Sequence, residues 1–202
     1  MAPTASKDPI KKLEEIKKYR VINQFYLAGG TGLNILLNHR DSMDLDFFTT
    51  YPIKPEGIIH AFKRRSKVQV VQMKADTLEF LLDGVPVSFF EYQYPLLESV
   101  KYHGIKIASL LDIALMKLIA ILQRGEQKDF IDLYSIITKG KVPLQTVFKA
   151  IPIKYKSVEI QMGAVLKSLV YFEDADKSPP LRLKNLNWKK IKAFFIENIK
   201  RF

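Results

Sequence analysis

The chain has 202 residues, of which 48% are hydrophobic and 26% are charged, a balance that is typical of a soluble globular core with room for a helical extension. It contains no cysteine, which excludes a disulfide framework, a thiolate zinc site and a cysteine nucleophile. Thirty-two Lys and Arg against 21 Asp and Glu give a formal net charge of +11, which favours polyanionic partners such as nucleic acid, although genome bias or solubility would produce the same excess.

Neither export nor membrane insertion is predicted. Residues 1–7 are polar and lack the apolar core of a signal peptide. No run approaches the roughly 20 apolar residues that cross a bilayer. We therefore expect a cytoplasmic protein that makes no membrane contact.

The N-terminal half alternates between helical and strand patterns. The predicted elements, in chain order, are a helix that begins after Asp8-Pro9, a strand over 25–28, a helix after Gly29-Gly30-Thr31, a strand over 43–48, a helix over 58–65, three strands over 67–73, 77–82 and 85–92, and a short strand over 104–107. Asp83-Gly84, between two of these strands, is a strong signal for a hairpin turn.

The C-terminal half has only helical patterns. The predicted elements are a helix from Ser109 with Asp112 as its capping partner, a break at Gly125, a second helix from about Glu126, helical segments over 144–148 and 158–169, a loop over 172–180 and a last helix over 188–199. The order predicts an α+β protein, with a small mixed β-sheet and flanking helices in residues 1–107 and a helical domain in residues 108–202.

The turn Gly29-Gly30-Thr31 separates a predicted strand from a predicted helix. Glycines there let backbone N–H groups approach an anion closely, and the start of the helix adds positive potential. A Gly-Gly pair in an ordinary turn would look the same, so this feature indicates a phosphate site only in combination with others.

Two carboxylates occur in Asp44-Leu45-Asp46 on the second predicted strand. Residues i and i+2 of a strand point to the same face, so both carboxylates project together while Leu45 turns toward the core. Such a pair suits Mg²⁺, which binds one or two carboxylates together with substrate phosphates. A solvated strand edge is the alternative.

A third cluster lies on the predicted helices around Gly125 and comprises Lys117, Arg124, Lys128, Asp129 and Asp132. Lys117 and Arg124 are seven residues apart and therefore share one helical stripe, beside the apolar face. Half-buried cations in this position could bind phosphates and complement a metal at the two aspartates. The alternative is a solvated helix face with intrahelical ion pairs.

Two stretches together resemble the AbiEii/AbiGii toxin family of nucleotidyltransferases, which act as toxins of type IV toxin–antitoxin systems. The first contains the Gly-Gly-Thr turn, the segment His39-Arg40-Asp41-Ser42 and the Asp-x-Asp strand. The second, from Lys117 to Tyr134, contains Lys-x-x-Ala followed by Arg124 and by Lys128-Asp129. Two separate motifs in the right order make the resemblance specific over roughly residues 25–134.

The resemblance implies a nucleotidyltransferase fold, Mg²⁺ as cofactor with two ions possible, and a nucleoside triphosphate as substrate. It assigns the metal to Asp44 and Asp46, and the chemistry to Asp44, Asp46, Lys117 and Asp129. It assigns nucleotide binding to Gly29, Gly30, Thr31, Arg40, Ser42, Lys117 and Arg124. In this scheme Asp129 orients the two cations or positions the acceptor.

One position departs from the pattern of many polymerase-like nucleotidyltransferases. Their third carboxylate, on a neighbouring strand, falls here at Ser88, and Glu91 lies on the opposite face of a regular strand. A bulge that brings Glu91 round, a substitute role for Asp129, or sufficiency of two carboxylates would each restore the site. If none holds, the general base is missing.

The expected activity is transfer of a nucleotidyl group to RNA, with a tRNA 3′ end as acceptor and pyrophosphate as leaving group. One alternative is a hydroxyl of a protein as acceptor. The other is a module that binds nucleotide or RNA without turnover. The resemblance also implies a neutralising antitoxin, a DNA-binding protein encoded nearby.

Overall fold

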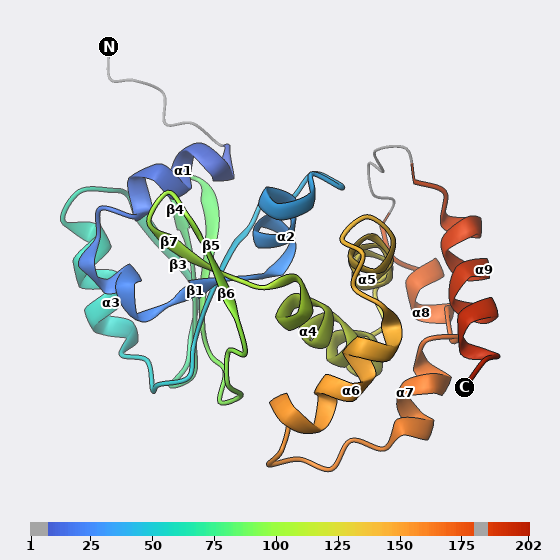
Figure 1. Ribbon diagram of the computed structural model, residues 1–202. Helices are drawn as coiled ribbons and strands as arrows, with labels where there is room; N and C mark the ends of the chain where they lie inside the picture. Colours follow the sequence, from blue (N-terminus) through green and yellow to red (C-terminus); the bar gives the residue numbers. More distant parts are fainter. Residues whose placement is uncertain (1–7, 180–185) are drawn as a thin grey trace. The chain divides into compact units, whose positions relative to one another are not determined.

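The computed structural model of the chain describes residues 8–179 and 186–202 (Figure 1). These residues form two compact units. The first holds the described chain up to Ile35 and Ser42–Ser109, and the second holds Leu36–Asp41 and the chain from Leu110 onward. Residues 1–7, on which the expectation of no export rests, lie outside the described residues.

The first unit is built on a seven-stranded mixed sheet with the order β3-β4-β5-β2-β1-β7-β6. The pairs β1–β7 and β2–β5 are parallel and the other neighbours are antiparallel. Its strands are β1 (Tyr26–Leu27), β2 (Leu45–Thr49), β3 (Val68–Met73), β4 (Thr77–Leu82), β5 (Val85–Glu91), β6 (Ser99–Tyr102) and β7 (Ile105–Ala108). The sequence did not predict β6, an edge strand whose Ser99, Val100 and Lys101 are exposed and lack an apolar alternation.

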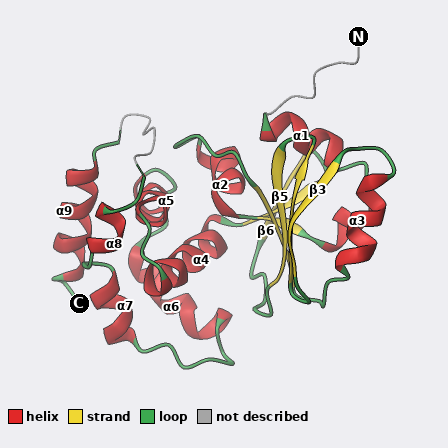
Figure 2. Ribbon diagram, turned by 180° about the vertical axis from the view of Figure 1, so that it is seen from behind, coloured by secondary structure: helices red, strands yellow, loops and turns green. Residues whose placement is uncertain are grey.

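The helices of this unit lie on both sides of the sheet. Helix α1 (Pro9–Ile16) and helix α3 (Pro55–Lys63) lie on one side and the start of α2 (Gly29–Leu37) on the other (Figure 2). Asp8 caps α1 as predicted, because its carboxylate accepts the N–H of Ile10 at 2.9 Å. A 3₁₀ helix, η1 (Arg20–Gln24), was not predicted and leads directly into β1.

The core of the first unit is aromatic and lies under α3. Phe47, Phe80 and Phe89 point from β2, β4 and β5 to one face of the sheet and are fully buried. Phe62 of α3 packs on Phe80 and Phe89, with ring centroids 5.4 and 5.9 Å apart. Because strand side chains alternate, Asp46 belongs to the opposite face of β2 and is only half-buried.

The predicted hairpin turn sets the register of β4 and β5. Asp83 and Gly84 both have positive φ, 50° and 88°, as a two-residue turn of this hand requires. Leu82 therefore pairs with Val85, and the pairing continues without a shift along both strands.

The second unit is helical, as predicted. Its helices are α4 (Leu110–Gln123), α5 (Gln127–Thr138), α6 (Leu144–Lys154), α7 (Met162–Ser168), α8 (Glu173–Asp176) and α9 (Trp188–Ile199). Gly125, at φ 58°, breaks the chain between α4 and α5. The predicted helix over 158–169 is wrong at its start, which is Met162, and the predicted loop over 172–180 contains the short helix α8.

The mixed sheet with flanking helices and the all-helical second half confirm the predicted α+β class. Across the described segments, every helix is too short or too polar to cross a bilayer.

Candidate functional site

Asp46 on β2 lies directly against Gly29, the first residue of α2. A Cβ atom added to Gly29 would stand 2.2 Å from Asp46 Oδ2, and Gly29 has φ 63°, a left-handed conformation that side chains rarely adopt. Both observations require glycine at this position. The predicted glycine turn and the predicted acidic strand therefore meet in the structure.

Thr31 fixes the position of the acidic strand relative to α2. Its side chain is fully buried, and its hydroxyl donates to the main-chain oxygen of Asp44 at 2.5 Å. The main-chain N–H of Ala28 donates to the oxygen of Asp46 at 3.0 Å. These two bonds hold the segment Asp44-Leu45-Asp46 at the start of the helix.

The first turn of α2 presents backbone donors at the same place. Helix geometry leaves the N–H groups of Gly29, Gly30 and Thr31 without an acceptor inside the helix, since the first intrahelical bond runs from Gly32 N to Ala28 O. Donors at a helix start favour a bound anion. Carboxylates and anion-binding donors thus lie next to each other in the first unit.

Glu79 is the carboxylate that the sheet places in line with Asp46. Asp46 pairs with Ser88 across β2 and β5, and Ser88 pairs with Glu79 across β5 and β4. Cross-strand partners share a face, so all three side chains project from the same side, with roughly 10 Å between the outer two strands. The pairing of β5 continues unshifted to Glu91, so no bulge turns Glu91 to this face.

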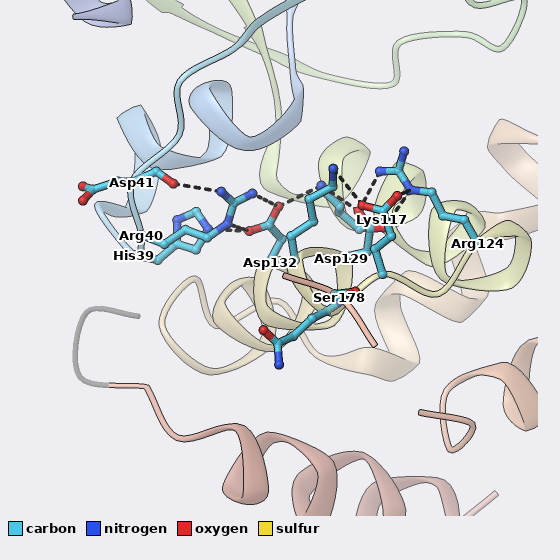
Figure 3. Close-up of polar contacts among 11 residues, drawn as sticks. His39, Arg40, Asp41, Lys117, Arg124, Asp129, Asp132 and Ser178 are labelled. Carbon is cyan, nitrogen blue, oxygen red and sulfur yellow. Dashed lines mark hydrogen bonds and ion pairs between the residues drawn. The ribbon is translucent and has the colours of Figure 1, made fainter. Parts of the chain in front are cut away.

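In the second unit, Asp129 and Asp132 of α5 are fully buried and are bridged by one cation (Figure 3). Lys117 Nζ of α4 is 3.0 Å from Asp129 Oδ1 and 2.8 Å from Asp132 Oδ2. Lys117 is itself only 8% exposed. The sequence left open that these residues form a solvated helix face with ion pairs inside one helix. Lys117 does not fit that description, because its partners are buried and lie on another helix.

The segment that precedes β2 is anchored to this cluster. Arg40 donates from Nε and Nη2 to the two oxygens of Asp132, at 2.6 and 2.8 Å, and His39 Nε2 lies 2.7 Å from Asp132 Oδ1. Both side chains are buried. The sequence motifs contain Asp132 and His39, but they did not predict a role for either residue. The i, i+3 spacing of Asp129 and Asp132 could have indicated that the two carboxylates share one helix face.

Arg124 completes the cluster at its solvent side. It donates from Nε and Nη2 to the oxygens of Asp129, at 2.9 and 3.1 Å, and its side chain is 49% exposed. We refer to Arg40, Lys117, Arg124, Asp129 and Asp132 as the buried ion cluster. It contains three permanent cations and two carboxylates, and Arg124 Nε also lies 3.7 Å from Glu126 Oε1 outside the cluster.

In the buried ion cluster, the ion pairs shift the pKa values more strongly than burial does. Burial alone raises the pKa of Asp132, but the charge of Lys117 and the hydrogen bonds of His39 and Arg40 hold that pKa well below its usual range. Burial likewise opposes ionisation of Asp129, yet Lys117 and Arg124 lower its pKa. Burial lowers the pKa of Lys117, and the two carboxylates more than reverse this and raise it. The cluster is therefore fully charged at neutral pH.

Comparison with known proteins identifies the family. Residues 13–92, which contain the glycine turn, the His-Arg-Asp-Ser segment and both aspartates, match the family described as "Nucleotidyl transferase AbiEii toxin, Type IV TA system". The chain belongs to the AbiEii nucleotidyltransferase toxin family. It is accordingly a nucleotidyltransferase. Membership implies a nucleoside triphosphate as substrate and an antitoxin as partner.

Other proteins are similar to this AbiEii-family chain over nearly their full length. An uncharacterized protein of Aquifex aeolicus, aq_aa25, is 41% identical over 97% of the chain and 96% of its own length. A putative nucleotidyltransferase from Helicobacter pylori is 14% identical, with a TM-score of 0.55 and coverage of 96% of each chain. JHP933 from the same organism is 16% identical at the same TM-score, over 96% of this chain and 93% of its own. The two solved structures support the fold.

The AbiEii-family site suits a divalent cation that is held partly by substrate. Nucleotidyltransferases generally use such a cation. No group of three or more His, Cys, Asp or Glu side chains within residues 8–179 and 186–202 is arranged to hold a metal alone. Asp46 lies on β2 and Asp44 directly precedes it, since β2 begins at Leu45 and not at the predicted residue 43. Both offer carboxylate oxygens, and Mg²⁺ commonly binds through one or two carboxylates with phosphates and water as the other ligands. The donor set therefore fits.

The predicted site residues of the AbiEii-family chain fall in both units. Gly29, Gly30, Thr31, Asp44 and Asp46 come together in the first unit, where Ser42 is also found, half-buried. Those in the second unit, namely Arg40, Lys117, Arg124 and Asp129, come together in the buried ion cluster. Glu79 was not predicted.

Proposed function

We propose that the protein transfers a nucleotidyl group from a nucleoside triphosphate to the end of an RNA, with Mg²⁺ held by Asp44 and Asp46. The observation that carries the proposal is the contact between Asp46 and Gly29, where an added Cβ would lie 2.2 Å from Oδ2. Such close packing puts the carboxylate beside the backbone N–H groups at the helix start, where a cation and a phosphate would meet. A tRNA 3′ end is the acceptor that we favour.

The residues of the first unit have separate tasks in this proposal. The N–H groups of Gly29, Gly30 and Thr31 bind the phosphates, and the Thr31 side chain positions Asp44 through its bond to the main chain. Mg²⁺, when bound, neutralises the phosphates and orients the attacking oxygen toward the phosphorus. The acceptor hydroxyl forms the new phosphorus–oxygen bond as the bond to pyrophosphate breaks.

We assign the third carboxylate to Glu79. It shares the face of Asp46, and Ser88 between them has a small side chain that leaves room for an acceptor. Asp129 is a poor base, because both of its oxygens accept from cations and its pKa is lowered. Glu91 is on the other face. Glu79 therefore takes the proton of the acceptor hydroxyl.

In the second unit, we propose that Arg124 binds phosphate and that Lys117 acts mainly through position. The Arg124 side chain is half exposed, whereas Lys117 is nearly buried between two carboxylates. Asp129 receives hydrogen bonds from both and so orients them, which is the role that the family resemblance gave it. Arg40 donates to both carboxylate oxygens of Asp132 and so positions the segment before β2.

RNA is the favoured acceptor because the chain is strongly basic, with a net charge of +11. The test incubates the protein with each α-³²P-labelled nucleoside triphosphate, Mg²⁺ and total cell extract, and then digests the products with RNase or with protease. Label that RNase releases and protease does not is the expected result. Label that only protease releases would establish a protein hydroxyl as acceptor and exclude the RNA proposal.

A module that binds without turnover is the remaining candidate, motivated by Ser88 at the usual carboxylate position. It requires Mg²⁺-dependent nucleotide binding with no release of pyrophosphate in the presence of total RNA. Release of pyrophosphate that depends on both RNA and Asp46 excludes it.

A further inference from the structure

A groove of about 550 Å³ on the first unit is lined by cations from two elements. Lys18 and Arg20 come from the segment between α1 and β1, and Arg64 and Arg65 follow the end of α3. All four are exposed, and none forms an ion pair with any residue that the structure describes. No acidic residue is among those lining the groove. Unpaired like charges in one concavity repel one another unless an anion binds there.

Stabilisation of α3 does not account for this arrangement. Cations after the last turn of a helix interact favourably with its dipole, which explains Arg64 and Arg65. Lys18 and Arg20 belong to another element and add like charge beside them. The mutual repulsion of these four cations destabilises the fold locally and favours the binding of an anion.

A second, smaller cavity continues the basic surface along η1. It has a volume of about 100 Å³ and is lined by Lys17, Lys101 and Lys106 together with apolar and neutral residues. Lys17 is next to Lys18 in the chain but forms an ion pair with Glu14, so Lys101 and Lys106 are the cations that the second cavity adds. Both cavities are lined in part by residues of η1. A strip of cations of this kind matches a chain of phosphates better than a single small anion.

The side chains that line the groove suit the sugar-phosphate backbone of a nucleic acid. Three of the seven arginines of the chain line it, and a guanidinium binds phosphate with two parallel hydrogen bonds. Its one aromatic residue, Tyr19, is already engaged: the ring lies 4.3 Å from the Phe62 ring, centroid to centroid, and the hydroxyl lies 3.0 Å from Ser66 Oγ. The groove therefore offers charge without a free surface for base stacking.

We propose that this groove binds the sugar-phosphate backbone of the RNA acceptor, independently of base sequence. The proposal rests on the proposed function only in identifying the bound RNA as the acceptor. Arg20 and Gly29 are separated by nine residues, which span at most about 30 Å. A 20-nucleotide RNA is longer than this upper limit, so one strand can have its end at Asp46 and its backbone in the groove.

The test measures fluorescence anisotropy of a fluorescein-labelled 20-nucleotide RNA in EDTA and without nucleotide. The paired variant Arg64→Glu/Arg65→Glu is compared with Lys189→Glu/Lys190→Glu on α9, and each lowers the net charge from +11 to +7. We expect the groove variant to bind at least about tenfold more weakly and the control to change by less than about threefold. The salt dependence should also become shallower, by roughly 0.7 in log–log slope for each lost phosphate contact.

Equal losses in both variants, or unchanged binding by the groove variant, would overturn the proposal. The milder Arg64→Ala/Arg65→Ala variant, checked by its thermal transition, separates loss of binding from loss of fold. Retained RNA binding with lost binding of an acidic antitoxin would assign the groove to protein and also overturn it. Because the assay contains no metal or nucleotide, it can succeed even if nucleotidyl transfer to RNA is not found.

Discussion

Asp132 is the residue whose charge the second unit needs most, and Asp132→Asn tests this. Its carboxylate is fully buried and accepts from Arg40 through both oxygens, while Lys117 lies 2.8 Å away. The asparagine side chain keeps the shape but leaves Arg40 without its buried counter-charge and removes one of the two buried carboxylates that contact Lys117. Breaking a buried ion pair on one side costs about 3–5 kcal/mol. That is a large part of the roughly 5–15 kcal/mol by which most domains are stable.

Urea unfolding followed by tryptophan fluorescence measures this loss. Trp188 is the single tryptophan and packs on Phe130 of α5, with centroids 5.9 Å apart, so its emission reports on the second unit. Asp129→Asn is the matched control: it leaves Lys117 with Asp132, and half-exposed Arg124 with water, for a cost of about 1–3 kcal/mol. A loss below about 1 kcal/mol for Asp132→Asn, or a larger loss for the control, would show that the charge of Asp132 is not the main stabilising charge of the cluster.

The same comparison has a defined pH dependence. The pKa of Asp132 is lowered in the folded protein, so its contribution is present above the unfolded pKa of about 3.9 and disappears as the pH falls below it. The pKa of Lys117 is raised, so its contribution is present below about 10.4 and disappears as the pH rises further. The difference in unfolding free energy between wild type and Asp132→Asn should therefore be constant from about pH 5 to 9 and shrink in acid.

Two predictions concern the first unit. Gly29→Ala should reduce transfer by about a hundredfold or more, because its Cβ would collide with the Asp46 carboxylate. Gly84→Ala is the control: Gly84 also has a positive φ, but no atom lies within 4 Å of an added Cβ, so this variant should lose only stability. Equal transfer by both variants would contradict this. Glu79→Gln should reduce kcat by about 10²–10⁴-fold with little change in KM for the nucleotide. Glu91→Gln, on the opposite face of β5, should leave kcat unchanged. Steady-state kinetics in which Glu91→Gln lowers kcat more than Glu79→Gln would exclude Glu79 as the third carboxylate.

Most of the fold could be predicted from local patterns. Helix and strand periods, the cap at Asp8, the break at Gly125 and the hairpin at Asp83-Gly84 each depend on a few neighbouring residues. The edge strand β6 could not, since its exposed residues lack the apolar alternation that marks a strand. Helix α8 is a single turn, too short to show a period.

Part of the candidate site follows from local sequence. The i, i+2 spacing of Asp44 and Asp46 predicted one strand face for both carboxylates, but β2 begins at Leu45, so their joint role stays a prediction. Glu79 could have been found as well, because a two-residue turn at Asp83-Gly84 places residue 79 opposite Ser88. The bonds of Arg40 to Asp132 join residues 92 positions apart, and no local pattern reveals such a pairing.

In the proposed function, Asp46, placed against the start of α2, holds the cation and nucleotide for transfer. The most direct measurement is the single-turnover rate of label transfer from α-³²P nucleoside triphosphate to purified tRNA, with and without Mg²⁺, for wild type, Asp46→Asn and the surface variant Lys189→Glu on α9. We expect transfer by wild type and Lys189→Glu that requires Mg²⁺, and none above background by Asp46→Asn. Transfer by Asp46→Asn at the wild-type rate would contradict the account.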